Sequence, residues 1–154
     1  MPGLFGPAVV DATIPAARSE VYRVLADPDT YPRWLKGAVR IRGVDDEFPA
    51  PGAEFHHSVG AAEGLHVDDA TEATAAEPNR HLGLMVHAVV FHARVDFALD
   101  DAPGGGTTVR FTEQPVGLFG PLTPLLRPLL KARNAASLRD LHTLLAERAG
   151  RAGG

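Results

Sequence analysis

The sequence predicts an α+β protein in which one antiparallel sheet packs against a single long C-terminal helix. The chain has 154 residues, which is the size of one ordinary domain. Alternating apolar and polar residues, the pattern of strands with one buried face, dominate from residue 38 to 115. A leucine-rich stripe with helical spacing begins near Thr123. Alternating strands that meet one helix on their apolar face form an α+β arrangement.

The N-terminal part of the chain predicts one strand and two short helices. Ala8–Ile14 is short, apolar and β-branched, as strands are. Pro15 suits the first turn of a helix, and Asp27 followed by Pro28 ends that helix. A second short helix is expected over residues 28–35.

About six strands are expected to follow. The stretch 81–99 is too long for one ordinary strand, so we divide it near Ala88. The glycine-rich loop after residue 101 indicates that the last two strands form a hairpin. Turns are expected at residues 45–52, 60–64 and 77–80. The expected strands cover residues 39–43, 53–59, 65–76, 81–88, 91–99 and 107–114.

The last element is predicted to be a helix. Thr123 is a good N-cap with Pro124 behind it, although Pro128 should kink the helix or delay its start. Arg133 lies off the apolar stripe. The stripe consists of Leu126, Leu130, Asn134, Leu138, Leu141 and Leu145.

Composition excludes several classes of protein. The chain has no cysteine, so disulfide frameworks, thiolate metal sites and cysteine catalysis are excluded. Its net charge of −4 argues against a nucleic-acid surface. The first ten residues lack the basic region of a signal peptide, and no apolar run reaches the length of a membrane helix. We expect a soluble, cytoplasmic monomer or homodimer without stable membrane insertion.

The opening of the chain resembles the signature of the START-like superfamily, and more narrowly its polyketide cyclase/dehydrase branch, often called SRPBCC. The matching residues are Ile14, Pro15, Glu20, Val21, Tyr22, Val24, Leu25, Asp27, Tyr31, Pro32 and Trp34. The resemblance implies a helix-grip fold as a single domain over residues 1–154, with its core at about 8–148. About seven strands would curve around the last helix and leave a cavity for apolar ligands. The superfamily includes aromatase/cyclases, lipid and quinone carriers, hormone receptors and chaperone activators, so the resemblance locates a site without fixing its chemistry.

Histidine chemistry points to one residue. His57 shares a strand face with Phe55, whereas its neighbour His56 points to the opposite face. Imidazole titrates near neutral pH, so His57 is the best acid/base or orienting candidate, with a hydrogen-bonded core histidine as the alternative. His92 is expected to face water. The seven histidines form no dense ligand motif, and we predict neither metal nor cofactor.

Two further polar residues interrupt apolar faces. Glu113 shares a strand face with Phe111, and Asn134 lies within the leucine stripe. Each needs a partner if it is buried: a ligand, a water molecule or a protein group. Because Glu113 lies near the end of its strand, solvent exposure is the favoured alternative for it. Trp34 is placed at the cavity mouth, although it could simply pack. The predicted ligand-binding residues are Trp34, Phe55, His57, Phe111, Glu113, Leu130, Asn134 and Leu138, and the first catalytic candidates are His57, Glu113 and Asn134.

Three functions remain open. The leading one is a binding protein for a hydrophobic or aromatic small molecule, polyketide-like or lipid-like. The alternative is a cofactor-independent polyketide cyclase/aromatase, in which the cavity folds a poly-β-ketone and polar groups move protons during aldol closure and dehydration. A third is an interaction module that assists another protein. Nucleophilic catalysis has no support, because no Gly-x-Ser-x-Gly elbow is present.

Overall fold

The computed structural model describes residues 3–62, 65–88 and 91–152. Its seven strands form one antiparallel sheet in the order β1-β7-β6-β5-β4-β3-β2. The strands are β1 (Ala8–Ile14), β2 (Ala38–Val44), β3 (Glu54–Ala62), β4 (Leu65–Glu77), β5 (His81–Ala88), β6 (Phe91–Asp101) and β7 (Thr107–Val116). The helices are α1 (Arg18–Leu25), the 3-10 helix η1 (Pro28–Thr30), α2 (Tyr31–Trp34), the 3-10 helix η2 (Gly117–Leu122) and α3 (Thr123–Ala152).

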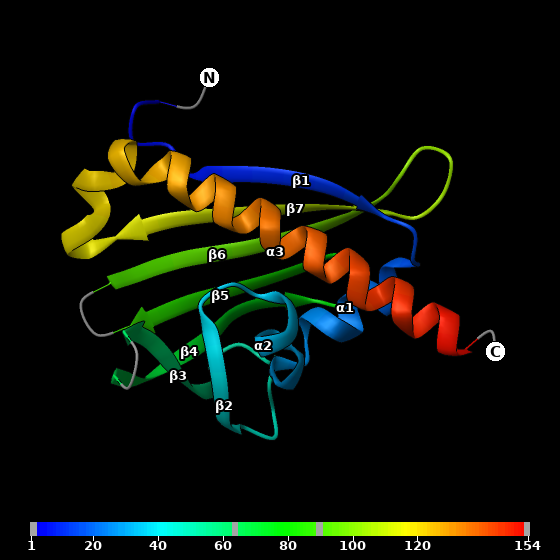
Figure 1. Cartoon of the computed structure of the whole chain (residues 1–154), viewed down its shortest axis with the longest axis horizontal. Helices are drawn as coiled ribbons and strands as arrows, with labels where there is room; N and C mark the ends of the chain where they lie inside the picture. Colours follow the sequence, from blue (N-terminus) through cyan, green and yellow to red (C-terminus); the bar gives the residue numbers. More distant parts are fainter. Residues whose placement is uncertain (1–2, 63–64, 89–90, 153–154) are drawn as a thin grey trace.

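The sheet curves around α3, which crosses its concave face, while α1 and α2 close one end (Figure 1). The first strand, β1, pairs with the last strand, β7, and not with β2, its successor in the sequence. This is the helix-grip arrangement that the sequence predicts.

The core lies between the concave face and α3. Every second residue of β6 from Ala93 to Leu99 is buried, and the same holds for β7 from Thr107 to Pro115. Leu138 and Leu141 of α3 meet this face and are at most 1% exposed. The predicted stripe is therefore the buried face of the helix.

The structure confirms the expected elements, although some of them begin or end at other residues than expected. The division at Ala88 is correct, because β5 and β6 pair as a hairpin. The expected turn at 60–64 begins later than predicted, since β3 continues to Ala62 through pairing with β4; residues 63 and 64 lie outside the described residues. The helix α3 begins at Thr123 itself and tolerates Pro128 in its second turn, where a proline costs one backbone hydrogen bond. The 3-10 helix η2 that precedes it was not expected. Within the described residues, no helix is both long and apolar enough to span a membrane.

Candidate functional site

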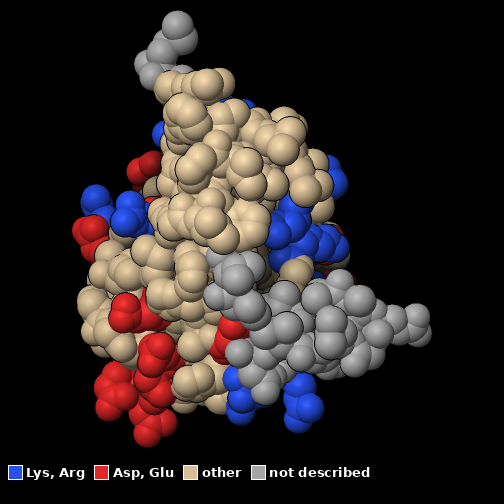
Figure 2. All heavy atoms as spheres, turned by 90° about the vertical axis from the view of Figure 1, so that its left-hand side faces the viewer, with Lys and Arg blue, Asp and Glu red and all other residues tan. Residues whose placement is uncertain are grey.

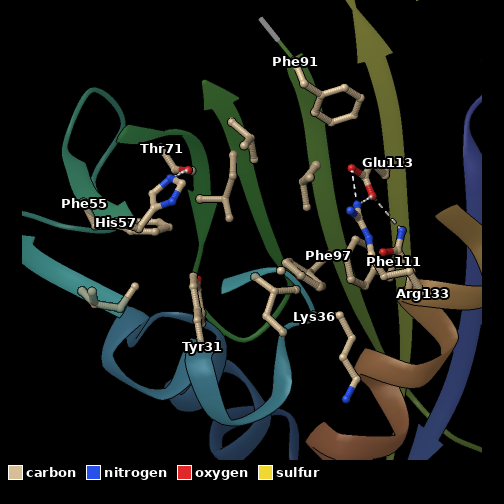
Figure 3. Close-up of a pocket in the computed structure, with 17 residues that line it drawn as sticks. Tyr31, Lys36, Phe55, His57, Thr71, Phe91, Phe97, Phe111, Glu113 and Arg133 are labelled. Atoms are coloured by element: carbon tan, nitrogen blue, oxygen red, sulfur yellow. Dashed lines mark hydrogen bonds and ion pairs between the residues drawn. The ribbon is translucent and has the colours of Figure 1, made fainter. Parts of the chain in front are cut away.

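A cavity of about 160 Å³ lies between the concave face of the sheet, α2 and α3. Figure 3 shows that its side chains come from the strands, from the α2 end and from α3. Alternation along each strand points Phe55 and His57 of β3 into the cavity, and likewise Phe111 and Glu113 of β7. Most of the wall is apolar: Tyr31, Leu35, Ile41, Phe55, Leu84, Val86, Phe91, Val95, Phe97 and Phe111.

The aromatic wall is ordered by edge and tilted contacts between rings. The Tyr31 and Phe55 rings have centroids 5.3 Å apart, and those of Phe97 and Phe111 are 4.5 Å apart. The Tyr31 hydroxyl donates to the Leu25 carbonyl oxygen, and burial raises the pKa of this phenol. Tyr31 therefore offers the cavity its ring and not its hydroxyl.

One polar group on the wall is the pair His57 and Thr71. His57 Nε2 lies 2.9 Å from Thr71 Oγ1, and the two side chains are buried. Burial lowers the pKa of His57 below its ordinary value, and the negative charge of Asp69 offsets this only in part. The imidazole is therefore neutral at neutral pH, which leaves it able to accept a proton.

The second polar group joins β7 to α3. Arg133 Nη2 donates to both carboxylate oxygens of Glu113, at 2.8 and 2.9 Å, and Asn134 Nδ2 donates to Glu113 Oε1 at 2.9 Å (Figure 3). Glu113 is only 3% exposed, so this partnering compensates a buried charge. Arg133 Nε and Nη1 and Asn134 Oδ1 take no part in these hydrogen bonds.

The segment after α2 forms another side of the cavity and is attached to α3. The Lys36 backbone N–H donates to Ser137 Oγ at 3.0 Å, and Lys36 Nζ lies 2.7 Å from Asp140 Oδ2. One turn earlier in α2, Arg33 forms a 3.6 Å ion pair with Glu147. Lys36 and Gly37 thus line the cavity from a position fixed by the helix.

Five of the predicted site residues line this one cavity: Phe55, His57, Phe111, Glu113 and Asn134. The sequence interpretation left open whether Glu113 faces solvent at its strand end; the structure buries it.

Trp34, Leu130 and Leu138 require correction, because none of them lines the cavity. Trp34 is 1% exposed, donates from Nε1 to Thr30 Oγ1 at 3.1 Å and packs behind the cavity-lining rings of Tyr31 and Phe97. It is a core residue and not a residue of the mouth. Leu130 and Leu138 are also packed, although they share a helix face with Asn134.

Sequence reasoning missed Arg133, Thr71 and Lys36. Arg133 lies off the helix stripe, but its long side chain reaches back to Glu113. Its neighbour Asn134 also donates to Glu113, and the position of Asn134 in the stripe could have suggested this contact. Thr71 is opposite Phe55 in the β3–β4 register and so lies diagonally from His57. That relation depends on strand register, which periodicity alone does not give.

Among the other histidines whose side chains are described, none lines the cavity. His56 is exposed, and His66 lies outside the residues whose side chains are described. His92 is partly exposed, with its Nδ1 3.1 Å from Nδ1 of His87 across the β5–β6 hairpin. Among the described residues, no three histidine or acidic side chains gather in a way that would hold a metal ion.

Solved structures share this fold at low sequence identity. A protein from Mesorhizobium loti has 22% identity and a TM-score of 0.70 over 92% of this chain and 97% of its own. A protein from Rhodobacter sphaeroides has 17% identity and a TM-score of 0.75 over 96% of each chain. The di-domain ARO/CYC protein StfQ of the steffimycin biosynthetic pathway has 15% identity and a TM-score of 0.69 over 94% of this chain and 51% of its own.

Sequence comparison gives the family. No curated protein is similar enough in sequence to count as a match. A family model described as "Polyketide cyclase / dehydrase and lipid transport" matches residues 8–146, which is nearly the whole described chain. The chain therefore belongs to the polyketide cyclase/dehydrase and lipid transport family.

Proposed function

We propose that the protein binds a compact hydrophobic or aromatic molecule that carries an oxygen acceptor. The observation that supports this most directly is the composition of the cavity wall: aromatic and aliphatic side chains surround two separate polar groups. Ligand sites are built in this way, with an apolar wall for affinity and a few polar groups for orientation.

The size of the cavity restricts the ligand. A cavity of about 150 Å³ is known to hold one benzene ring, and drug-sized ligands occupy roughly 300 Å³ or more. At about 160 Å³, this cavity suits a molecule of one or two rings better than a long extended chain.

The polar groups restrict the ligand's chemistry. Arg133 uses only Nη2 on Glu113, so its remaining N–H donors suit a carbonyl, phenol or carboxylate oxygen of the ligand. His57 would contact a second polar atom of the ligand, on the side of the ligand's ring opposite to Arg133. We expect apolar molecules without such atoms to bind more weakly.

A cyclase is the second candidate, and the neutral state of His57 favours it. In this mechanism His57 takes a proton from the carbon between two carbonyls, and Arg133 stabilises the enolate oxygen. Carbon–carbon closure and loss of water would follow. Glu113 and Asn134 would position Arg133 and the substrate.

Calorimetric titration with 1-naphthol and naphthalene tests the binding proposal. Leu84 lines the cavity, whereas Leu82 lies two residues earlier on the same face of β5 in the packed core. Leu84→Phe should fill the cavity and abolish 1-naphthol binding without loss of stability. Leu82→Phe should retain binding and lose about 1–3 kcal/mol of stability through overpacking. Unchanged binding by Leu84→Phe would contradict the proposal.

Product analysis separates the two candidates. A linear β-triketone thioester would be incubated with the wild type and with His57→Gln. A cyclised product lighter by one water, formed by the wild type and not by His57→Gln, would establish the cyclase. Binding of the thioester without turnover would support the carrier.

A further inference from the structure

One end of the molecule exposes large apolar side chains. Leu118 in η2 is 75% exposed, and Leu122, Leu125 and Leu129 are 44%, 77% and 67% exposed. The last three are spaced by three and four residues, so they share one face at the start of α3. This face is separate from the buried stripe.

The N-terminal segment extends the same surface. Leu4 and Phe5 are exposed, and Arg127 Nη2 holds their segment against α3 by donating to the carbonyl oxygens of Gly3, at 3.1 Å, and Leu4. We call the six side chains Leu4, Phe5, Leu118, Leu122, Leu125 and Leu129 the apolar tip. Figure 2 views this end of the molecule, and its upper part is largely free of charged residues. Exposed apolar patches of this kind mark interaction sites.

The charge around the apolar tip selects an anionic partner. Although the chain carries a net charge of −4, the stretch from residue 114 to 138 contains no Asp or Glu. Of its three basic residues, Arg133 is paired with Glu113, so Arg127 and Lys131 supply the positive charge at this end, and residues 3–10 carry no charge. A second copy of the chain would bring the same positive charge to this surface. An anionic lipid surface has the complementary charge.

The apolar tip is also connected to the cavity. Phe119 of η2 packs on Phe91 with ring centroids 5.6 Å apart, and Phe91 lines the cavity. Figure 1 shows η2, the start of α3 and the N-terminal segment at the same end of the molecule. Exposed leucine and phenylalanine side chains fit a fluid acyl layer, which adapts to their shape.

We propose that the apolar tip docks the protein on anionic lipid membranes. The leucines enter the acyl layer, and Lys131 lies against the headgroups. The docking is interfacial and reversible, and it does not depend on which ligand the cavity holds.

Co-sedimentation with vesicles tests this proposal. The probes are vesicles of phosphatidylcholine alone and vesicles with about 30% phosphatidylglycerol. We expect the wild type to bind the anionic vesicles, and Leu125→Glu/Leu129→Glu to bind them about tenfold less. Raising NaCl from about 0.1 to 0.5 M should weaken wild-type binding, because salt screens the basic residues.

The matched control places two carboxylates at the far end of the same helix. Ala146→Glu/Ala149→Glu changes two exposed residues there and should bind vesicles as the wild type does. Both variants alter only exposed positions, and an unchanged melting temperature verifies their fold. The proposal is overturned if the wild type binds neither vesicle, or if both double variants bind equally. It is also overturned if Leu125→Glu/Leu129→Glu abolishes a dimer in sedimentation equilibrium and leaves vesicle binding unchanged. Naphthol titration without vesicles reports on the cavity separately.

Discussion

The two polar groups of the cavity wall are similarly buried but differently held. Glu113 accepts three hydrogen bonds from two residues of α3, so this group ties the helix to the sheet and balances a buried charge. His57 Nε2 lies against Thr71 Oγ1 on the adjacent strand, the His57 ring packs against that of Phe55 with centroids 5.4 Å apart, and the imidazole carries no charge at neutral pH. We therefore expect the Glu113 group to contribute mainly to stability and the His57 group to serve ligand chemistry.

The largest loss of stability should come from replacing Arg133. Arg133→Met leaves Glu113 buried with Asn134 as its only partner, and we expect a loss of about 3 kcal/mol in the free energy of unfolding. Urea denaturation measures it. Arg139→Met, an exposed arginine on the same helix, is the control and should change stability by less than about 0.5 kcal/mol.

The double variant Arg133→Met/Glu113→Leu sharpens this test. It removes both charges, so most of the lost stability should return. If Arg133→Met alone is as stable as the wild type, the ion pair does not hold the helix to the sheet.

A smaller loss of stability is expected when Asn134 is replaced. Its amide donates to Glu113, so Asn134→Leu should lose about 1–2 kcal/mol of stability. Asn134 also lines the cavity, so the stabilisation by 1-naphthol should fall as well. Thermal denaturation with and without 1-naphthol measures both effects. A destabilised variant with an unchanged naphthol-induced shift would remove Asn134 from the site.

A change in the His57 group should affect stability less. Thr71→Val removes the hydroxyl partner of His57 and should cost about 1 kcal/mol. Thr74→Val, on an exposed position of the same strand, is the control. A loss larger than that of Arg133→Met would reverse the comparison.

The smallest effect should be on pH dependence. Because burial lowers the pKa of His57 in the folded protein, the unfolded chain takes up this proton first as pH falls. The contribution of His57 to stability is therefore complete above its unfolded pKa of about 6.5 and is lost as pH falls toward the folded pKa. Urea denaturation of the wild type and His57→Gln between pH 7.5 and 5, about the range in which imidazole titrates, measures it. Parallel pH profiles of the two would disprove the assignment.

Periodicity was sufficient to predict the order of elements and five of the residues that line the cavity. Strand alternation placed Phe55 with His57 and Phe111 with Glu113, because side-chain direction in a strand is set locally. Helical spacing placed Asn134 on the buried face of α3 for the same reason.

The other site residues could not be predicted from periodicity, because their positions depend on tertiary packing. The helical positions of Leu130 and Leu138 were correct, but only packing decides which residues of one face meet a cavity and which fill the core. Arg133 lies off the buried stripe of α3, but its side chain is long enough to reach Glu113. Trp34 was assigned to the mouth by resemblance, yet the adjacent rings of Tyr31 and Phe97 cover it.

The attachment of the segment after α2 to α3 has a consequence for the residence time of a ligand. A ligand that left past Lys36 would have to break both the Ser137 hydrogen bond and the Asp140 ion pair. Both charged ends are about half exposed, so salt weakens the ion pair, while the backbone hydrogen bond is insensitive to it. We therefore expect the dissociation rate of a bound naphthol to rise only slightly with ionic strength, and to rise far more when Ser137 is replaced by alanine.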